Sequence, residues 1–372
     1  MNLQTDVCIV GGGPAGAFLG YILAQKGIST VIIERATLTG RKFRGEHINA
    51  ETESLLKNYR LFEKIAEQGI LKMEKVEFFN GNVVVKTITP TSDQGHVGIH
   101  VPQAHLLNTL VSESEHHEHY HFLLNTTVTE LLRDKKGCYI GVKAKKDGKE
   151  IIVNSSVIVG ADGRYSTVRK LANIPVTITK HGYDVLWTKI PAPQGWEPTT
   201  RMALVNGHQL ALFTQAGGFI QIGWNIDEGS FSSLTKNSLK PFLEPLLESF
   251  PQLREIALQY LQSWKDFVCL KVESSRLKTW VQDGLVMIGD AAHTMTPTGA
   301  IGINSAMKDA HVLANVLVNA ILGKNTTAER LKEFEELRRD EIEKQQEQQI
   351  TQETSFWKNY LQASSDQLAA TC

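Results

Sequence analysis

The chain has 372 residues, of which 42% are hydrophobic and 21% charged, with a formal net charge of −1 at pH 7. This balance argues against a nucleic-acid partner or an anionic membrane surface, because both are recognised through clustered positive charge. Since single hydrophobic cores stop growing at about 250–300 residues, we expect two lobes.

Nothing in the sequence indicates export or membrane insertion. Four scattered cysteines (Cys8, Cys138, Cys269 and Cys372) form no C-x-x-C pair, which favours reduced thiols. The N-terminus lacks a basic region and a long apolar region, so no signal peptide is expected. Apolar runs fall short of the about 18 residues that a transmembrane helix needs, so no membrane span is expected. These features predict a cytoplasmic protein.

The N-terminal residues follow a strand–turn–helix–strand pattern. An apolar run over 7–10 ends in a glycine-rich turn, and a second run over 30–33 ends at Glu34. Gly11, Gly13 and Gly16 match G-x-G-x-x-G: the first turns the chain, the second admits a pyrophosphate, and the third lets helix pack on strand. Glu34 follows at close to the spacing of about 20 residues expected for a carboxylate that binds a ribose hydroxyl.

A nucleotide with a diphosphate would lie where the first helix begins, because helix N-terminal N–H groups and the helix dipole favour phosphate. The predicted cofactor contacts also include three neighbours of the motif residues. They are Pro14, Ala15 and Arg35.

Alternating loops, helices and hairpins are expected next. Residues 35–46 are polar and basic and predict a loop, whereas 51–68 carry apolar residues at helical spacing. Residues 76–89 predict a hairpin around Asn80-Gly81-Asn82. Four histidines between 116 and 121 resemble a metal tract, but no acidic or cysteine partner closes a site, so a solvated helix end is favoured and no metal is expected.

In the middle of the chain the predicted elements become mostly strands. Residues 139–153 predict a hairpin around Asp147-Gly148, and 156–160 a buried strand. From about 176 to 281 strand-like runs dominate and predict a mostly antiparallel second lobe, which the earlier hairpin joins. Two helical patterns within it cover 241–248 and 253–264.

The C-terminal third returns to the first pattern. A buried strand over 285–288 ends at Gly289-Asp290, and 303–322 is helical. Residues 329–361 predict a long charged helix with a sparse apolar stripe, too short for sustained heptads. A helix packed across both lobes is therefore favoured over a partner-binding coiled coil.

Three segments together carry a family resemblance. They are the opening glycine motif, Gly160-Ala161-Asp162-Gly163-Arg164, and Gly289-Asp290-Ala291-Ala292-His293 with the Pro297-x-Gly299-x-x-Gly302 loop behind it. In this order and at these separations they resemble the class A flavoprotein monooxygenases, the 4-hydroxybenzoate hydroxylase-like family. The middle lobe matches this family only in its succession of strand-like runs.

The resemblance implies an α/β fold with a Rossmann-like FAD-binding domain of the GR2 type. That domain covers 1–72, 97–175 and 279–325. A second, mostly antiparallel β-sheet substrate domain covers 73–96 and 176–278. A C-terminal helix over 326–372 bridges the lobes.

The resemblance also implies contacts with FAD. Asp290 accepts a hydrogen bond from the ribityl chain, and the helix near Gly302 directs its N–H groups at the flavin pyrimidine edge, where reduced flavin gathers negative charge. Asp162 is expected to lie between the cofactor-binding loop and the path by which nicotinamide approaches, and to order a turn. Arg44, in Arg44-Gly45-Glu46, lies near the diphosphate or ring. The remaining contacts implied are Gln103, Pro297, Gly299, Ile303 and Asn304.

Two positions depart from the family pattern. Gln103 stands where many members carry arginine, so a contact with the ribityl chain survives without the charge. Ile301 replaces a frequent glutamine or lysine, which leaves only backbone contacts at that position. His293 is interpreted as a packing residue that orders its loop.

The substrate is expected between the second sheet and the flavin. Alternation over 219–225 puts Phe219, Gln221, Gly223 and Asn225 on one face, and this polar face with a glycine gap is favoured for the pocket. No catalytic residue is required beyond the flavin. The candidates for a catalytic role are His47, Gln221 and Pro297, and Phe213 and Met295 are expected as further neighbours of the substrate.

The activity that the resemblance implies is monooxygenation. NAD(P)H, bound transiently because only one dinucleotide fingerprint is present, reduces FAD; the reduced flavin forms a hydroperoxide with O2, which hydroxylates a small aromatic or polycyclic phenol-like substrate. Three alternatives remain: a halogenase, although residues 187–191 match only part of W-x-W-x-I-P; a prenyl reductase with an apolar tunnel; and a non-catalytic flavin-binding sensor.

Overall fold

The structure of the protein is a computed structural model that describes residues 1–37, 45–91, 93–205 and 207–370, with side chains described as far as Thr354. Its strands are β1 (Asn2–Val10), β2 (Thr30–Ile33), β3 (His47–Ile48), β4 (Leu71–Lys72), β5 (Lys75–Asn80), β6 (Val83–Ile88), β7 (Ile99–His100), β8 (Tyr120–Leu123), β9 (Thr126–Arg133), β10 (Tyr139–Lys146), β11 (Lys149–Gly160), β12 (Val176–Pro191), β13 (Thr199–Val205), β14 (His208–Gln215), β15 (Phe219–Asp227), β16 (Val268–Leu277), β17 (Val281–Gln282) and β18 (Leu285–Met287).

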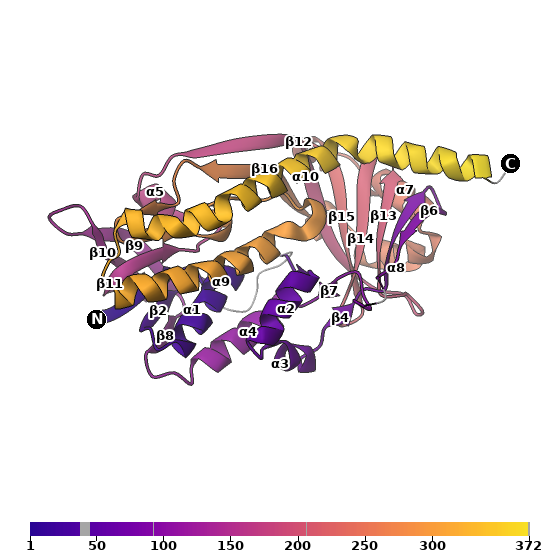
Figure 1. The fold of residues 1–372 in the computed structure, drawn as a ribbon. Helices are drawn as coiled ribbons and strands as arrows, with labels where there is room; N and C mark the ends of the chain where they lie inside the picture. The colour runs from indigo at the N-terminus through magenta and orange to yellow at the C-terminus, as the bar shows by residue number, and fades with distance from the viewer. Residues whose placement is uncertain (38–44, 92, 206, 371–372) are drawn as a thin grey trace.

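The helices join and cover these strands (Figure 1). They are α1 (Pro14–Gln25), α2 (Ala50–Asn58), α3 (Phe62–Glu67), α4 (Gln103–Ser114), α5 (Thr167–Leu171), α6 (Phe231–Leu234), α7 (Leu239–Ser249), α8 (Arg254–Tyr260), α9 (Ile301–Leu322) and α10 (Ala328–Ala370), with the short 3-10 helices η1 (Pro251–Leu253), η2 (Trp264–Asp266), η3 (Gly289–Ala291) and η4 (Thr298–Ala300).

The first lobe is built on an eight-stranded sheet of the described chain, in the order β17–β18–β11–β1–β2–β8, with β10 and β9 continuing from β11. β8, β2, β1, β11 and β18 run parallel to one another, whereas β17 pairs antiparallel with β18 at the edge. α1 packs against α4 and α9. The side chains of α1 are buried from Ala15 to Ala24 because the helix is apolar on nearly every face.

The second lobe is a seven-stranded sheet of the described residues, in the order β16–β12–β15–β14–β13–β5–β6. All its pairs are antiparallel except β13 with β5. The hairpin predicted over 76–89 is therefore confirmed, and so is its place in the second sheet. One face of this sheet packs on α7 and α8 through an apolar core that includes Leu186, Ile222 and Phe250.

The long helix α10 crosses the molecule beside α9, from the first sheet to the second (Figure 1). Leu331, Phe334 and Ile342 from its sparse apolar stripe enter the core of the first lobe. α10 also contacts β17 of the first sheet and β6 of the second. The α/β fold with a Rossmann-like domain, an antiparallel second sheet and a C-terminal helix is confirmed.

Two predicted helices were wrong in their extent. The helix predicted over 51–68 is divided into α2 and α3, because Arg60 adopts the left-handed conformation (φ 57°) between them. The helix predicted over 253–264 is only α8: Leu261 leaves helical geometry (ψ 80°), and the Ser263 side chain caps the separate turn η2. Apolar periodicity continued through both breaks, so the pattern alone predicted one helix each time.

A small three-stranded sheet of described residues, β3–β7–β4, was not predicted, because its strands have two residues each. It places His47 opposite His100.

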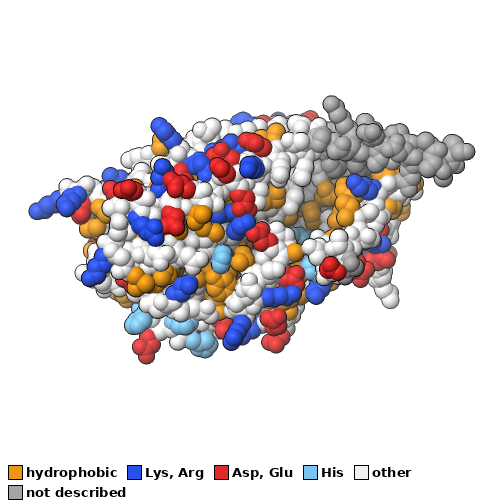
Figure 2. All heavy atoms as spheres, in the orientation of Figure 1, with side chains coloured by type: hydrophobic (Ala, Val, Ile, Leu, Met, Phe, Trp, Pro, Cys, Tyr) orange, Lys and Arg blue, Asp and Glu red, His pale blue; other side chains and the backbone are white. Residues whose placement is uncertain are grey.

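Acidic and basic side chains are interspersed over the face of the molecule that Figure 2 shows. No helix in the described part of the chain combines the length and the apolarity needed to cross a bilayer.

Candidate functional site

The three motif segments meet at one edge of the first sheet. Val10 is in register with Ile33 on one side and Gly160 on the other, and Gly160 is in register with Met287. The parallel strands therefore end in one row, and the turns that follow them lie side by side. Ligands of open parallel sheets bind beyond these carboxyl ends.

The glycine-rich turn contains two glycines that packing requires and one that it does not. Gly11 has φ +109°, and a Cβ on Gly11 would lie 2.3 Å from the carbonyl oxygen of Ala161. A Cβ on Gly16 would lie 1.9 Å from the carbonyl oxygen of Gly11. Around Gly13 nothing lies within 4 Å of that position. The open space adjoins Pro14 and Ala15, where α1 begins, and fits the pyrophosphate of FAD.

Glu34 lies beside this turn and is buried. Its Oε2 accepts a hydrogen bond from Gly12 N (2.8 Å) and its Oε1 accepts one from Ala36 N (2.8 Å). A carboxylate at this place in a dinucleotide-binding fold is the group that accepts a hydrogen bond from a ribose hydroxyl. Arg35 is exposed next to it. Arg44, also predicted as a cofactor contact, lies outside the described residues.

Asp162 orders the second segment. Its carboxylate accepts hydrogen bonds from Ser166 Oγ (2.5 Å), Thr167 N (2.6 Å) and Val168 N (3.1 Å), at the start of α5. Burial raises the pKa of this carboxyl, against the lowering effect of these bonds. Arg169 donates to the Ala291 carbonyl (3.0 Å) and so links this segment to the third one.

A buried ion network supports the third segment, where Asp290 lies on η3. Asp309 Oδ2 lies 2.6 Å from His293 Nε2 and accepts from Gly289 N (2.9 Å), while Oδ1 accepts from Arg338 Nε (2.9 Å). Burial alone would raise the pKa of Asp309, but His293 and Arg338 hold it below its usual value. His293 thus orders the loop from inside the protein.

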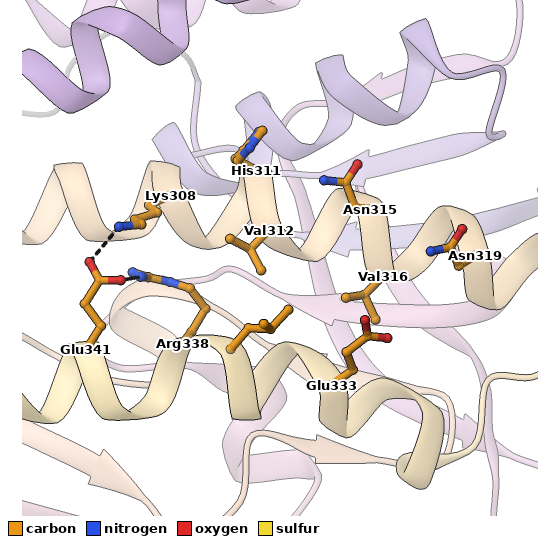
Figure 3. Close-up of a pocket in the computed structure, with 10 residues that line it drawn as sticks. Lys308, His311, Val312, Asn315, Val316, Asn319, Glu333, Arg338 and Glu341 are labelled. Atoms are coloured by element: carbon orange, nitrogen blue, oxygen red, sulfur yellow. Dashed lines mark hydrogen bonds and ion pairs between the residues drawn. The ribbon is translucent and has the colours of Figure 1, made fainter.

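The same arginine continues the network outwards between α9 and α10. Figure 3 shows Lys308 and Arg338 converging on Glu341, with Lys308 Nζ 2.8 Å from Glu341 Oε1. His311, Leu337 and their neighbours line a surface groove of about 300 Å³ beside these ions. The contacts hold the two longest helices together.

The loop before α9 contains two consecutive left-handed residues, Gly299 (φ 74°) and Ala300 (φ 52°). α9 begins directly after them, so Gly302 and Ile303 lie in its first turn, whose N–H groups have no partner within the helix. Asn304 Oδ1 accepts from Asn49 N (3.0 Å), and its Nδ2 donates to the His47 carbonyl (3.2 Å). The N-terminus of α9 is thereby tied to β3 and the residue that follows it.

A cavity of about 520 Å³ lies between this loop and the second sheet. One row of side chains forms its floor across five strands. In register order the row is Trp187, Gly223, Ala211, Met202 and Phe78. This floor is apolar and aromatic, as small-molecule sites usually are.

Several residues expected near the substrate lie on the cavity wall and others do not. Phe213, Gly223, Asn225 and Pro297 line the cavity. The opposite face of β15 holds Ile220, Ile222 and Trp224 in the apolar core. Met295 is buried in the core of the first lobe.

Gln221 and Gln103 belong to a polar network around Glu46. Gln215 Nε2 lies 2.5 Å from Gln221 Oε1 and 3.3 Å from Glu46 Oε2, which also lies 3.2 Å from His100 Nε2. Gln103 N donates to Glu46 Oε1 (3.0 Å). Burial alone would raise the pKa of Glu46, but His100 and Gln103 lower it. Gln221 is thus buried, is joined to Glu46 through Gln215, and is not among the described residues that line the cavity.

His47 is the titratable imidazole on the wall. Its ring centroid lies 5.4 Å from that of Phe213 and 5.7 Å from that of His100. Burial, and secondarily His100, lowers its pKa to about 3, so the ring is neutral at physiological pH. Within the described structure no hydrogen-bond partner reaches its buried Nε2, which leaves that atom available to a ligand.

The cavity residues that were not predicted as part of the site include Tyr183, Trp187 and Glu353. Period-two alternation along β12 places Tyr183 and Trp187 on one face and could have suggested them. Glu353 comes from a charged stretch of α10 that has no sequence signal for a site. The described residues also contain no group of three or more His, Cys, Asp or Glu side chains arranged to hold a metal ion.

Gly223 is expected to set the depth of the floor. A Cβ on it would lie 2.6 Å from Trp187 Cζ3, so Gly223→Ala should tilt the indole into the cavity. Excluding the volume of one methylene from a pocket costs about 10–200-fold in specificity. We expect the affinity for large planar ligands to fall in this range and that for small ones much less, as binding titrations with ligands of two sizes would measure. Equal losses for both sizes would contradict this role.

Known proteins resemble this chain over most of its length. The FAD binding domain family matches residues 4–349. 6-Methylpretetramide 4-monooxygenase from Streptomyces rimosus is 31% identical over 352 residues, which cover 94% of this chain and 84% of that protein. Digeranylgeranylglycerophospholipid reductase from Methanothrix thermoacetophila is 24% identical over 351 residues, 92% of this chain and 85% of that protein.

The fold has solved counterparts as well. The structure of PqsL from Pseudomonas aeruginosa in complex with 2-aminobenzoylacetate superposes with a TM-score of 0.82 at 20% identity. The aligned part covers 95% of this chain and 96% of PqsL. At this identity the likeness shows the fold, including the arrangement of the two lobes.

Proposed function

The chain belongs to the FAD binding domain family and is an FAD-dependent monooxygenase, and we propose that it hydroxylates an aromatic, phenol-like substrate, either single-ring or polycyclic. The proposed electron donor is NAD(P)H, which binds transiently, and the oxygen source is O2. The relative that acts on 6-methylpretetramide supports a polycyclic substrate within this class.

The cavity is the observation that carries this proposal. Its floor is aromatic, its volume of about 520 Å³ lies within the range of pockets for small molecules, and a neutral imidazole lies on its wall. It adjoins the loop at Pro297 and Gly299 that leads to the N-terminus of α9. A planar substrate on this floor would face the cofactor.

The bound flavin supplies hydride acceptance and oxygen activation. The protein's own residues bind and orient the substrate. Trp187 and Phe213, whose ring centroids lie 6.1 Å apart, offer flat apolar surfaces that exclude water. His47 Nε2 is proposed to hydrogen-bond the phenolic oxygen and to fix which ring carbon faces the flavin.

Replacing His47 with phenylalanine keeps a ring in place but removes this contact. We expect kcat/KM for the phenolic substrate to fall at least about tenfold, the usual cost of one lost buried hydrogen bond. The KM for NAD(P)H should not change. His121→Phe, at an exposed position of β8, is the control. An unchanged kcat/KM in His47→Phe would remove this residue from substrate recognition.

Substrate-stimulated NAD(P)H oxidation with labelled oxygen tests the function itself. Purified holoenzyme is offered a panel of phenols and polycyclic phenols, and the products are analysed by mass spectrometry under ¹⁸O2. The expected product carries one ¹⁸O atom. A product that gains two hydrogens and no oxygen would indicate a reductase instead, which the archaeal relative makes worth testing. A product halogenated only when halide is added would indicate a halogenase.

A further inference from the structure

The last described side chains of α10 form hydrogen bonds with the loop that leads into α9. Gln349 makes three hydrogen bonds to its backbone: Oε1 accepts from Thr296 N (3.3 Å), and Nε2 donates to the carbonyls of Thr296 (3.0 Å) and Thr298 (2.6 Å). An amide that satisfies both donors and acceptors of a loop fixes its path.

Glu353 lies one turn further along the same face of α10. Its Oε1 accepts hydrogen bonds from Thr296 Oγ1 (2.7 Å), Thr298 Oγ1 (2.7 Å) and Tyr183 Oη (3.0 Å). Its Oε2 lies 2.6 Å from His181 Nδ1. Burial alone would raise the pKa of Glu353, but these bonds hold it below its usual value. The group is therefore a carboxylate, which can accept all of them at once.

The loop needs such contacts because its backbone is strained. Gly299 and Ala300 both have positive φ, and alanine avoids the left-handed region for steric reasons. Strained segments persist when their surroundings over-determine them. The same loop sets where α9 begins and forms part of the cavity wall, together with Tyr183 and Glu353.

We propose that Glu353 is a positioning residue for the flavin: with Gln349 it holds residues 296–300 in the conformation that presents the N-terminus of α9 to FAD. Through Tyr183 the same carboxylate links this loop to the β12 wall of the substrate cavity. The C-terminal helix is thus part of the cofactor site although it follows every cofactor motif in the chain. The inference rests on FAD binding and does not depend on which substrate is used.

Glu353→Gln tests the inference in the FAD-loaded protein. The amide keeps the size of the side chain, but it offers one acceptor oxygen in place of two and turns donors towards His181 or Tyr183. Hydrogen exchange of residues 296–301 should quicken at least about tenfold, and the dissociation constant of FAD should rise about tenfold, equivalent to about 1.4 kcal/mol. The visible spectrum of the bound flavin should shift.

Two further variants separate positioning from mere helix stability. Glu336→Gln removes a carboxylate from the exposed side of α10, where Glu336 pairs with Lys332, and should change none of these readouts. Thr298→Val leaves α10 intact and removes one donor to Glu353; it should quicken exchange in the same loop by a smaller factor.

Two results would overturn the inference. One is that hydrogen exchange of residues 296–301 and the affinity for FAD stay at their wild-type values in both Glu353→Gln and Thr298→Val. The other is exchange in Glu353→Gln that quickens equally along all of α10, since Glu353 would then serve only to attach the helix. Either result would leave the proposed hydroxylation unaffected, because product analysis tests that separately.

Discussion

A Gly13→Val variant should fold normally and lose FAD. Gly13 has ordinary extended backbone (φ −73°, ψ −176°), and no atom lies within 4 Å of the position that a Cβ would take. A Cβ there therefore meets no protein atom outside its chain neighbours, but the methyl groups of valine would enter the space into which a pyrophosphate must come. Steric intrusion of this kind costs about 1–3 kcal/mol, so FAD affinity should fall about 5- to 150-fold. Fluorescence titration of the apoprotein measures it.

Gly16→Ala is the matched comparison for this variant. Its Cβ would lie 1.9 Å from the Gly11 carbonyl oxygen, so the protein itself must shift whether or not FAD is present. We expect a lower thermal unfolding midpoint of the apoprotein in Gly16→Ala but not in Gly13→Val. Wild-type FAD affinity in Gly13→Val would show that the pyrophosphate does not approach this turn.

An Asp309→Asn variant should have the largest effect on stability. Asp309 is fully buried, and so are its partners His293 and Arg338. Removing one charge of a buried ion pair leaves the other uncompensated and costs about 3–5 kcal/mol. The third motif segment should loosen too, because Gly289 N and His293 both bond to this carboxylate. The midpoint of urea unfolding, followed by circular dichroism, measures the loss.

The control and the pH dependence sharpen this prediction. Asp340→Asn removes the same charge from an exposed position of α10 and should be close to neutral. Because the pKa of Asp309 is lowered in the folded protein, its stabilisation is complete above the unfolded carboxyl's pKa and is lost as pH falls through the lowered value. The gap between wild type and Asp309→Asn should therefore narrow in acid. A gap that is constant with pH would contradict the assignment.

Local sequence determined the first lobe well. The glycine spacing, the strand that precedes it and Glu34 lie within one continuous stretch, so ordinary strand, turn and helix chemistry is enough to predict the cofactor turn. The hairpin around Gly81 and the alternation along β15 are equally local, since a turn residue and a period of two specify them.

The tertiary structure decided what lies between distant segments. Alternation divided β15 into two faces, but only the register of neighbouring strands placed Gly223 beside Trp187. Only the tertiary structure placed Gln215 where it bonds to both Gln221 and Glu46. Glu353 carried no signal at all, because a glutamate in a charged helix looks like any solvated residue. Its role depends on α10 crossing the loop before α9, and contacts that distant in sequence have no local pattern to reveal them.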